Sequence, residues 1–259
     1  MVDESGPELI TSQTSGAMVH RLGLNAWRLE IPAGPAGRYR LAQLDDYRGL
    51  RRGGFRWRPP LRLVLQARAG AATIPGTWGF GLWNDPFGMG ILSGTDLIRL
   101  PVLPNTAWFF FASPPNDLSL RDDLPARGAL AATFRSPQWP GALSLLAVPV
   151  LPLLALPPLA RLLRRLAGRV VQQDTALLFS NQAEWHCYEM AWREEEVQFW
   201  VDGVRVLQTA GSPRGRLGLV LWVDNQYAAI PPSGRLRYGT LANPEPAWIE
   251  IRDFVIGHF

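Results

Sequence analysis

The sequence of 259 residues contains no lysine, one cysteine and three histidines. All 26 basic residues are arginine, which, with abundant glycine and proline, indicates a GC-rich genome more than a special function. The single Cys187 excludes an intrachain disulfide framework, and so few sulfur and imidazole ligands argue against a zinc site. The net charge is only +4, and most arginines are dispersed among acids, so no nucleic-acid partner is expected.

The N-terminal segment also lacks the features of a signal peptide. Its first fifteen residues are polar and acidic, without a basic n-region or an apolar core. We therefore expect a cytoplasmic protein. Residues 1–17 are expected to form a flexible tail, followed by a single domain over residues 18–259.

What the sequence does contain is a regular alternation of apolar and polar residues, broken every 8–12 residues by Gly, Pro or Asp. This spacing predicts many short antiparallel strands in an all-β sandwich or barrel. The expected strands cover residues 26–31, 39–44, 55–58, 61–69, 78–83, 107–112, 130–135, 175–179, 185–192, 197–201, 204–206, 217–223 and 248–256.

The clearest strands lie in the segment 185–208. His186, Tyr188, Met190 and Trp192 alternate and should share one face of a strand. A charged turn leads to a second strand, and the pair Asp202-Gly203 forms a two-residue hairpin turn before a third. The segment therefore predicts a meander of three antiparallel strands.

An apolar insertion at about 137–173 interrupts the β pattern. No charge occurs between Arg135 and Arg161, and Leu143–Leu159 is long enough to approach a membrane span. Four prolines within that run argue against a spanning helix, because each removes a backbone donor and kinks a helix.

The end of the insertion predicts a short basic amphipathic helix. Leu159, Leu162, Leu163, Leu166 and Val170 recur at helical spacing, and arginines occupy the rest of the surface. One interpretation packs this apolar stripe on the domain. The others place Leu159–Val171 on an acidic lipid surface as a peripheral membrane contact, or over a site as a lid.

Three stretches resemble the concanavalin A-like lectin/glucanase superfamily, and within it the jelly roll of glycoside hydrolase family 16. They are the strand pair 61–69 and 76–84, the meander 185–203 with its Val-Asp-Gly turn, and the closing strand 248–256. The resemblance implies a jelly-roll β-sandwich with a carbohydrate-binding cleft. It also implies a structural calcium ion near Asp253, although one aspartate does not make a site.

The sequence departs from that family at its catalytic strand. The hydrolases carry Glu-x-Asp-x-Glu on one strand, which places carboxylates on one face at the separation that a retaining mechanism needs. By order and spacing, the equivalent strand is Thr106–Ser113, which contains no carboxylate. We therefore expect the standard glycosidase chemistry to be absent.

Aromatic and polar residues near strand ends are the candidate ligands for a sugar, because rings stack on aromatic faces and hydroxyls pair with amides and carboxylates. The candidate binding residues are Trp83, Asn84, Asp85, Trp108, Asn116, Tyr188, Asn225 and Gln226. The candidate catalytic residues are Asp85, Asp117, His186 and Asp224. Each also has a structural interpretation, as a turn residue, a core aromatic or a hydrogen-bonded histidine.

The sequence therefore favours a non-catalytic, lectin-like protein whose ligand is a glycan or an apolar small molecule. One alternative is a divergent hydrolase that uses loop carboxylates. The other is a membrane-surface or partner-binding protein that acts through the apolar insertion. The expected strand 107–112, which we call the Phe-rich strand, is apolar on both faces. Its second face therefore needs a cover.

Overall fold

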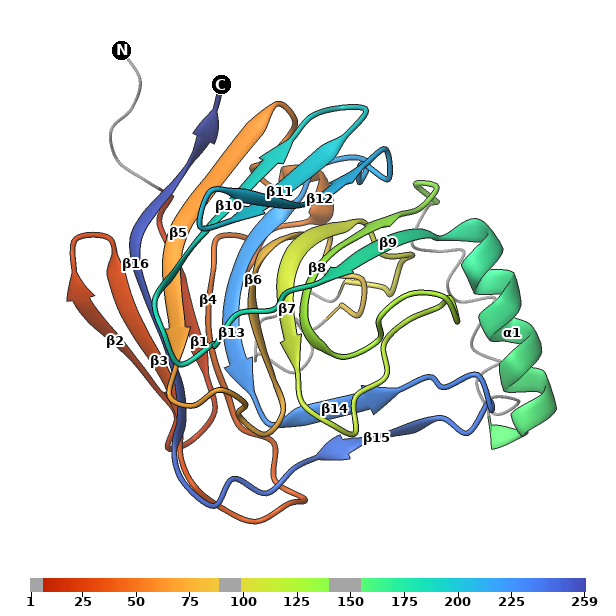
Figure 1. Ribbon diagram of the computed structural model, residues 1–259, viewed down its shortest axis with the longest axis horizontal. Coiled ribbons are helices and arrows are strands. Elements are labelled where there is room, and N and C mark those ends of the chain that lie inside the picture. Colours follow the sequence, from red (N-terminus) through yellow and green to blue (C-terminus); the bar gives the residue numbers. More distant parts are fainter. Residues whose placement is uncertain (1–6, 89–98, 140–154) are drawn as a thin grey trace.

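The computed structural model describes residues 7–88, 99–139 and 155–259, and it consists mainly of two packed seven-stranded sheets (Figure 1). Sheet A has the order β1 (Ile10–Gln13), β4 (Leu41–Asp45), β13 (Gly218–Asp224), β6 (Thr77–Trp83), β7 (Thr106–Ala112), β8 (Gly128–Arg135) and β9 (Gln172–Leu177). Sheet B has the order β12 (Val204–Thr209), β11 (Val197–Val201), β10 (His186–Trp192), β5 (Leu61–Ala69), β16 (Ala247–His258), β3 (Ala26–Ile31) and β2 (Met18–Gly23).

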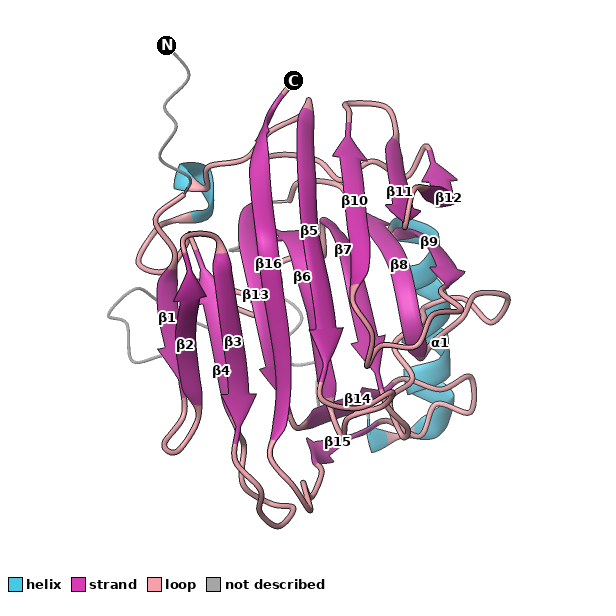
Figure 2. Ribbon diagram, turned by 60° about the vertical axis from the view of Figure 1, so that its left-hand side comes forward, coloured by secondary structure: helices cyan, strands magenta, loops and turns pink. Residues whose placement is uncertain are grey.

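Three smaller elements lie outside these sheets. A two-stranded ribbon joins β14 (Gln226–Ala229) to β15 (Arg237–Thr240), and a short 3-10 helix, η1, covers Arg52–Gly54. The helix α1 (Pro157–Val170) lies beside the edge strand β9 and the loops near the ribbon (Figures 1 and 2). All strand pairs within both sheets are antiparallel, so the all-β sandwich expected from the sequence is confirmed.

Most predicted strands are present, with shifts of at most three residues at their ends. Two expectations differ from the structure. Residues 55–58 form only an isolated bridge, Trp57 to Leu217, because the backbone there follows a 3-10 turn. Residues 10–13, expected within a flexible tail, pair with β4 as an edge strand, and Ser12 is buried there.

The main core fills the space between the two sheets. From sheet A, β6 contributes Trp78 and Phe80, and β7 contributes Phe109 and Phe111. Trp78 stacks on Phe111 with ring centroids 3.6 Å apart, and Tyr188 of sheet B meets the rings of Phe80 and Phe109 edge to face. Period-two alternation along each strand places these residues on one face.

The opposite face of sheet A, which points away from sheet B, carries a second apolar cluster. We call it the outer cluster; its buried members are Tyr47, Phe55, Trp83, Phe110, Ala112, Leu130, Val220 and Trp222, with Trp108 partly buried against them. Trp108 packs against Phe110 and Trp222, with ring centroids 5.1 and 5.5 Å apart. Both faces of the Phe-rich strand are therefore buried. Residues 140–154 of the insertion lie outside the described residues.

Gly79 on β6 creates the space in which the Trp222 ring lies. A β-carbon built on Gly79 would be 2.4 Å from the carbonyl oxygen of Phe109 and 2.7 Å from the Trp222 ring. The absence of a side chain therefore lets the indole lie directly on the sheet, while the Trp222 Nε1–H donates to Thr77 Oγ1 at 3.0 Å.

We predict that Gly79→Ala destabilises the protein by about 1–3 kcal/mol, because the methyl group forces the backbone or the indole to move. The measurement is the urea unfolding midpoint. Gly257→Ala is the matched control, since a β-carbon at that strand position meets no atom within 4 Å. Equal stability of the two variants would contradict the packing described here.

Candidate functional site

The largest described cleft opens where several strands of sheet A end. It has a volume of about 890 Å³, within the range of small-molecule sites. Its lining comes from the end of β6, the loops before β7 and after β8, and the loop before β13. The lining residues are Arg52, Gly53, Arg58, Pro59, Asn84, Val102, Leu103, Asn105, Pro137, Gln138, Trp139, Glu194, Pro213, Arg214, Gly215 and Arg216. We call it the arginine cleft.

Asn84 and Asn105 form the rigid base of the arginine cleft. The Asn84 side chain accepts from the Asn105 backbone N–H at 3.0 Å and donates to the Leu103 carbonyl at 2.9 Å. The Asn105 side-chain oxygen accepts from the backbone N–H groups of Ser136 and Arg214, at 3.1 and 2.8 Å. These bonds tie four separate chain segments together, so the base is held without a ligand.

The four arginines of the cleft differ in how many hydrogen bonds their guanidinium groups already form. Arg52 donates to the backbone carbonyls of Asn84, Asp85 and Leu100 at 2.6–2.7 Å, so its guanidinium is already fully engaged. Arg216 donates to the Phe55 carbonyl at 3.0 Å. In the part of the chain that the structure describes, the exposed guanidinium groups of Arg58 and Arg214 form no hydrogen bond or ion pair. These two cations are available to a ligand.

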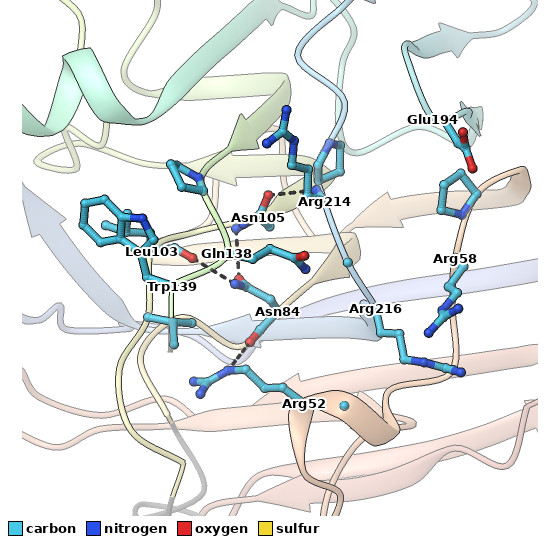
Figure 3. Close-up of a pocket in the computed structure, with 16 residues that line it drawn as sticks. Arg52, Arg58, Asn84, Leu103, Asn105, Gln138, Trp139, Glu194, Arg214 and Arg216 are labelled. Carbon is cyan, nitrogen blue, oxygen red and sulfur yellow. Dashed lines mark hydrogen bonds between the residues drawn. The ribbon is translucent and has the colours of Figure 1, made fainter. Parts of the chain in front are cut away.

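The remaining walls combine an aromatic ring with one acid. Figure 3 shows Trp139 on one side of the cleft and Arg58 and Arg216 on the other, with the amides between them. Trp139 is 53% exposed. Glu194 is the one acidic side chain among the described lining residues, so the cleft has an excess of positive charge.

Of the candidate binding residues, only Asn84 lines the arginine cleft. Trp83 and Trp108 belong to the outer cluster, and Tyr188 lies in the core between the sheets. Asn116 and Asn225 are fully buried and bond to backbone groups of neighbouring loops, so they act as loop braces. Gln226 begins β14 and is exposed.

The four candidate catalytic residues do not meet in one cleft. Asp85 follows β6 at the cleft end of sheet A, but its side chain is completely buried. Asp224 ends β13 opposite Thr77, at the other end of β6. Asp117 lies beside β14, where it makes a bridge to Ala229. His186 belongs to sheet B, where its Nδ1 lies 2.6 Å from Asp202 in the hairpin turn.

Asp253, the candidate for calcium, is an exposed residue of β16. Its carboxylate accepts from Gln66 Nε2 at 2.9 Å and lies 4.0 Å from Arg252, whose charge would repel a cation. No group of three or more His, Cys, Asp or Glu side chains that could hold a metal ion occurs among the described residues.

The arginine cleft was not predicted from the sequence, because most arginines are dispersed among acids along the chain. A signal was present in the spacing. Arg214 and Arg216 flank Gly215 shortly before β13, and Arg58 lies three residues before the start of β5. In an antiparallel sandwich, loops at strand ends on the same edge converge, although one sequence does not say which loops share an edge.

Comparisons with known proteins find a family model that matches one part of the chain. The model of "Glycosyl hydrolases family 16" matches residues 166–215, about a fifth of the chain, and this range contains the meander β10–β12 but not β7. No curated protein matches the chain. The chain therefore resembles glycoside hydrolase family 16 over the meander, as the sequence indicated.

Solved structures with similar folds include hydrolases and a lectin-like domain. A family 16 endo-glucanase from Bacteroides ovatus has 11% identity and a TM-score of 0.48, with 94% of this chain and 85% of that chain covered. A legume lectin-like domain from Entamoeba histolytica has 7% identity and a TM-score of 0.46, with 96% and 90% covered. A sialidase has 9% identity and a TM-score of 0.43. The match covers 96% of this chain but only 17% of that chain. None of these likenesses transfers an activity to this chain.

Asp85 and Arg99 form a buried ion pair, with Asp85 Oδ2 2.7 Å from Arg99 Nε. We predict that Asp85→Asn destabilises the protein by about 3–5 kcal/mol, because Arg99 keeps its charge in a buried position without a counter-ion. Thermal unfolding measures the change. Asp123→Asn, at an exposed pair with Arg121, should leave the melting temperature almost unchanged. The opposite order would contradict a structural role for Asp85.

Asp224 has an unusual acidity. Burial raises the pKa of its carboxyl to about 7, although hydrogen bonds from Thr77 and the Gln226 backbone partly oppose this shift. An unfolded aspartate has a pKa of about 3.9, so between pH 4 and pH 7 the folded state binds more protons. Stability from this group is therefore lost as the pH rises through this window.

We predict that Asp224→Asn is more stable than the wild type at pH 8, by an amount on the order of a few kcal/mol, and equally stable near pH 4. Asparagine keeps an oxygen that accepts from Thr77 and removes the charge. Urea unfolding at both pH values measures the difference. Burial also raises the pKa of Asp46 to about 6. Asp46 is present in both proteins, so its contribution to the pH dependence of stability cancels in the difference. A difference that does not depend on pH would contradict the assignment.

Proposed function

We propose that this protein binds carbohydrate in the arginine cleft without hydrolysing it. The observation that supports this most directly is the combination around one cleft of the exposed Trp139, a set of amides, and two cations, Arg58 and Arg214, that have no ion-pair partner among the described residues. The resemblance of the meander to family 16 agrees with a glycan as ligand.

The chemistry of the lining suits a sugar. The flat face of Trp139 offers a surface on which a pyranose ring can stack, and the Gln138 amide offers both a donor and an acceptor to hydroxyl groups. Gln138 lies against Gly215, where a β-carbon would be only 1.8 Å from its Nε2. The glycine therefore gives this amide a defined position beside the cleft.

The excess of positive charge favours an acidic glycan. A guanidinium group pairs with a carboxylate or sulfate through two parallel hydrogen bonds, which adds geometric selectivity to the electrostatic attraction. Arg52 and Arg216 are engaged by backbone carbonyls, so they contribute charge, while Arg58 and Arg214 supply free donors. A uronate or a sulfated sugar is therefore the class of ligand that we propose for the cleft that Arg58 and Arg214 line.

The positions of the carboxylates support binding over hydrolysis. On the outer face of β7, where the family carries its acids, this chain has Thr106, Trp108, Phe110 and Ala112. Asp45 of β4 and Asp224 of β13 also lie on the outer face of sheet A. These two strands pair with each other, but the two residues are four positions apart in register, or about 13 Å. A glycosidase needs a pair separated by roughly 5–9.5 Å, and the arginine cleft itself contains a single described acid, Glu194.

We predict that the double variant Arg58→Gln/Arg214→Gln binds oligogalacturonate at least about tenfold more weakly than the wild type, because it loses two charge-assisted contacts. Isothermal titration calorimetry measures the affinity. Arg205→Gln is the control, since this exposed arginine lies outside the cleft. Neutral gluco-oligosaccharides should bind more weakly and respond less to the double variant.

A reducing-sugar assay on the same oligosaccharides tests the second half of the proposal. We expect no release of reducing ends above the buffer control. Release by the wild type that is lost in Glu194→Gln would show a hydrolase that uses this residue. Binding that is equal for the wild type and the double variant would show that the arginine cleft is not the site.

A further inference from the structure

The helix α1 is attached to the sandwich through an arginine rather than through its leucines. Arg164 is 7% exposed, and its guanidinium donates to Asp122 Oδ1 at 2.5 Å and to the carbonyls of Ser119 and Ile230 at 3.1 and 2.9 Å. Ala160, one turn earlier, is also buried. The side of α1 that faces the protein therefore carries one arginine and a small residue, and none of the helix leucines is buried there.

The apolar side of α1 consequently faces outward. Leu162 is 51% and Leu166 43% exposed, and Leu156 and Val170 at the two ends are exposed as well. Surface helices of globular proteins normally bury such a stripe. This corrects the interpretation that the stripe packs on the domain, since only Leu159 and Leu163 are partly covered. A contiguous exposed apolar stripe indicates a contact with something other than this chain's own core.

A row of positive charge runs beside the leucines. Arg161, Arg165 and Arg169 are spaced four residues apart, so they form one line along the helix surface next to the leucine line. All three are exposed, and among the described residues none of them forms an ion pair. The helix contains no acidic residue. Arg235 is also exposed, next to Gly234, which packs on the first turn of α1.

We propose that α1 lies in the surface of a bilayer rich in anionic lipid, with its leucines among the acyl chains and its arginines at the headgroup phosphates. A basic amphipathic helix with an exposed apolar face matches both layers of that surface. A second copy of the chain matches less well, because a symmetric contact would bring two rows of arginine together. Nucleic acid would pair with the arginines but leave the leucines in water.

The length of the helix fits lying on a membrane rather than crossing it. Fourteen residues extend about 21 Å, less than the roughly 30 Å of a bilayer core. Among the described residues, no helix is long and apolar enough to span a membrane. This inference is independent of the arginine cleft, because it rests on different residues at a different part of the surface.

Vesicle co-sedimentation of the whole protein tests the proposal. We expect binding to vesicles of phosphatidylcholine and phosphatidylglycerol in a 3:1 ratio, and at least about tenfold weaker binding to pure phosphatidylcholine, since each arginine near an anionic surface contributes roughly fivefold in affinity. Binding should fall between 0.1 and 0.5 M NaCl because salt screens the attraction.

Two double variants separate the contributions of the helix. Leu162→Gln/Leu166→Gln and Arg165→Gln/Arg169→Gln should each reduce vesicle binding at least about tenfold, while their unfolding temperatures stay near that of the wild type, because all four side chains are exposed. Leu24→Gln and Arg205→Gln, exposed residues elsewhere, are the matched controls and should leave binding unchanged.

Three results would overturn the proposal: equal binding to both vesicle types, no effect of either double variant, or no vesicle binding together with a dimer that the leucine variant dissociates. Light scattering after size-exclusion chromatography measures the last of these. A dimer of that kind would assign the leucine stripe to a second copy of the chain.

Discussion

The burial of apolar side chains on both faces of sheet A is the constraint on which the rest of the structure depends. Phe109 and Phe111 of β7 face sheet B, while Trp108 and Phe110 face the outer cluster. A strand that alternates in this way has only two faces, and both are occupied by aromatic rings. Among the described residues, β7 at the centre of sheet A therefore carries no carboxylate on either face.

This constraint moves the free polar groups to the ends of the strands. Asn84, Asn105, Arg58 and Arg214 all lie where strands of the sandwich end and loops begin. Here water can reach the side chains, and the hydrogen bonds of Asn84 and Asn105 hold the loops in place. The arginine cleft therefore lies at the strand ends, beside the packed sheet and not on its face.

The helix α1, at the edge of the sandwich, is also held by polar contacts. The sheets already bury their apolar surface without it, so the helix is held by Arg164 and its hydrogen bonds, and its leucines remain outside. The helix α1 and the arginine cleft are the two features of the surface for which we propose a binding partner. The two features use separate residues and can be removed one at a time.

Local patterns in the sequence are enough to predict several elements of the fold. The alternation at β5 and β10, the Asp202-Gly203 turn, and the amphipathic spacing of α1 all follow from side-chain period and backbone preference within a few residues. Which faces and loops come together depends instead on how the distant strands pack. The tertiary structure buries Asp85 against Arg99, turns the leucines of α1 outward, and gathers arginines more than 150 residues apart into one cleft. These outcomes depend on the pairing of distant strands, whose energies are sums over many contacts that no local spacing encodes.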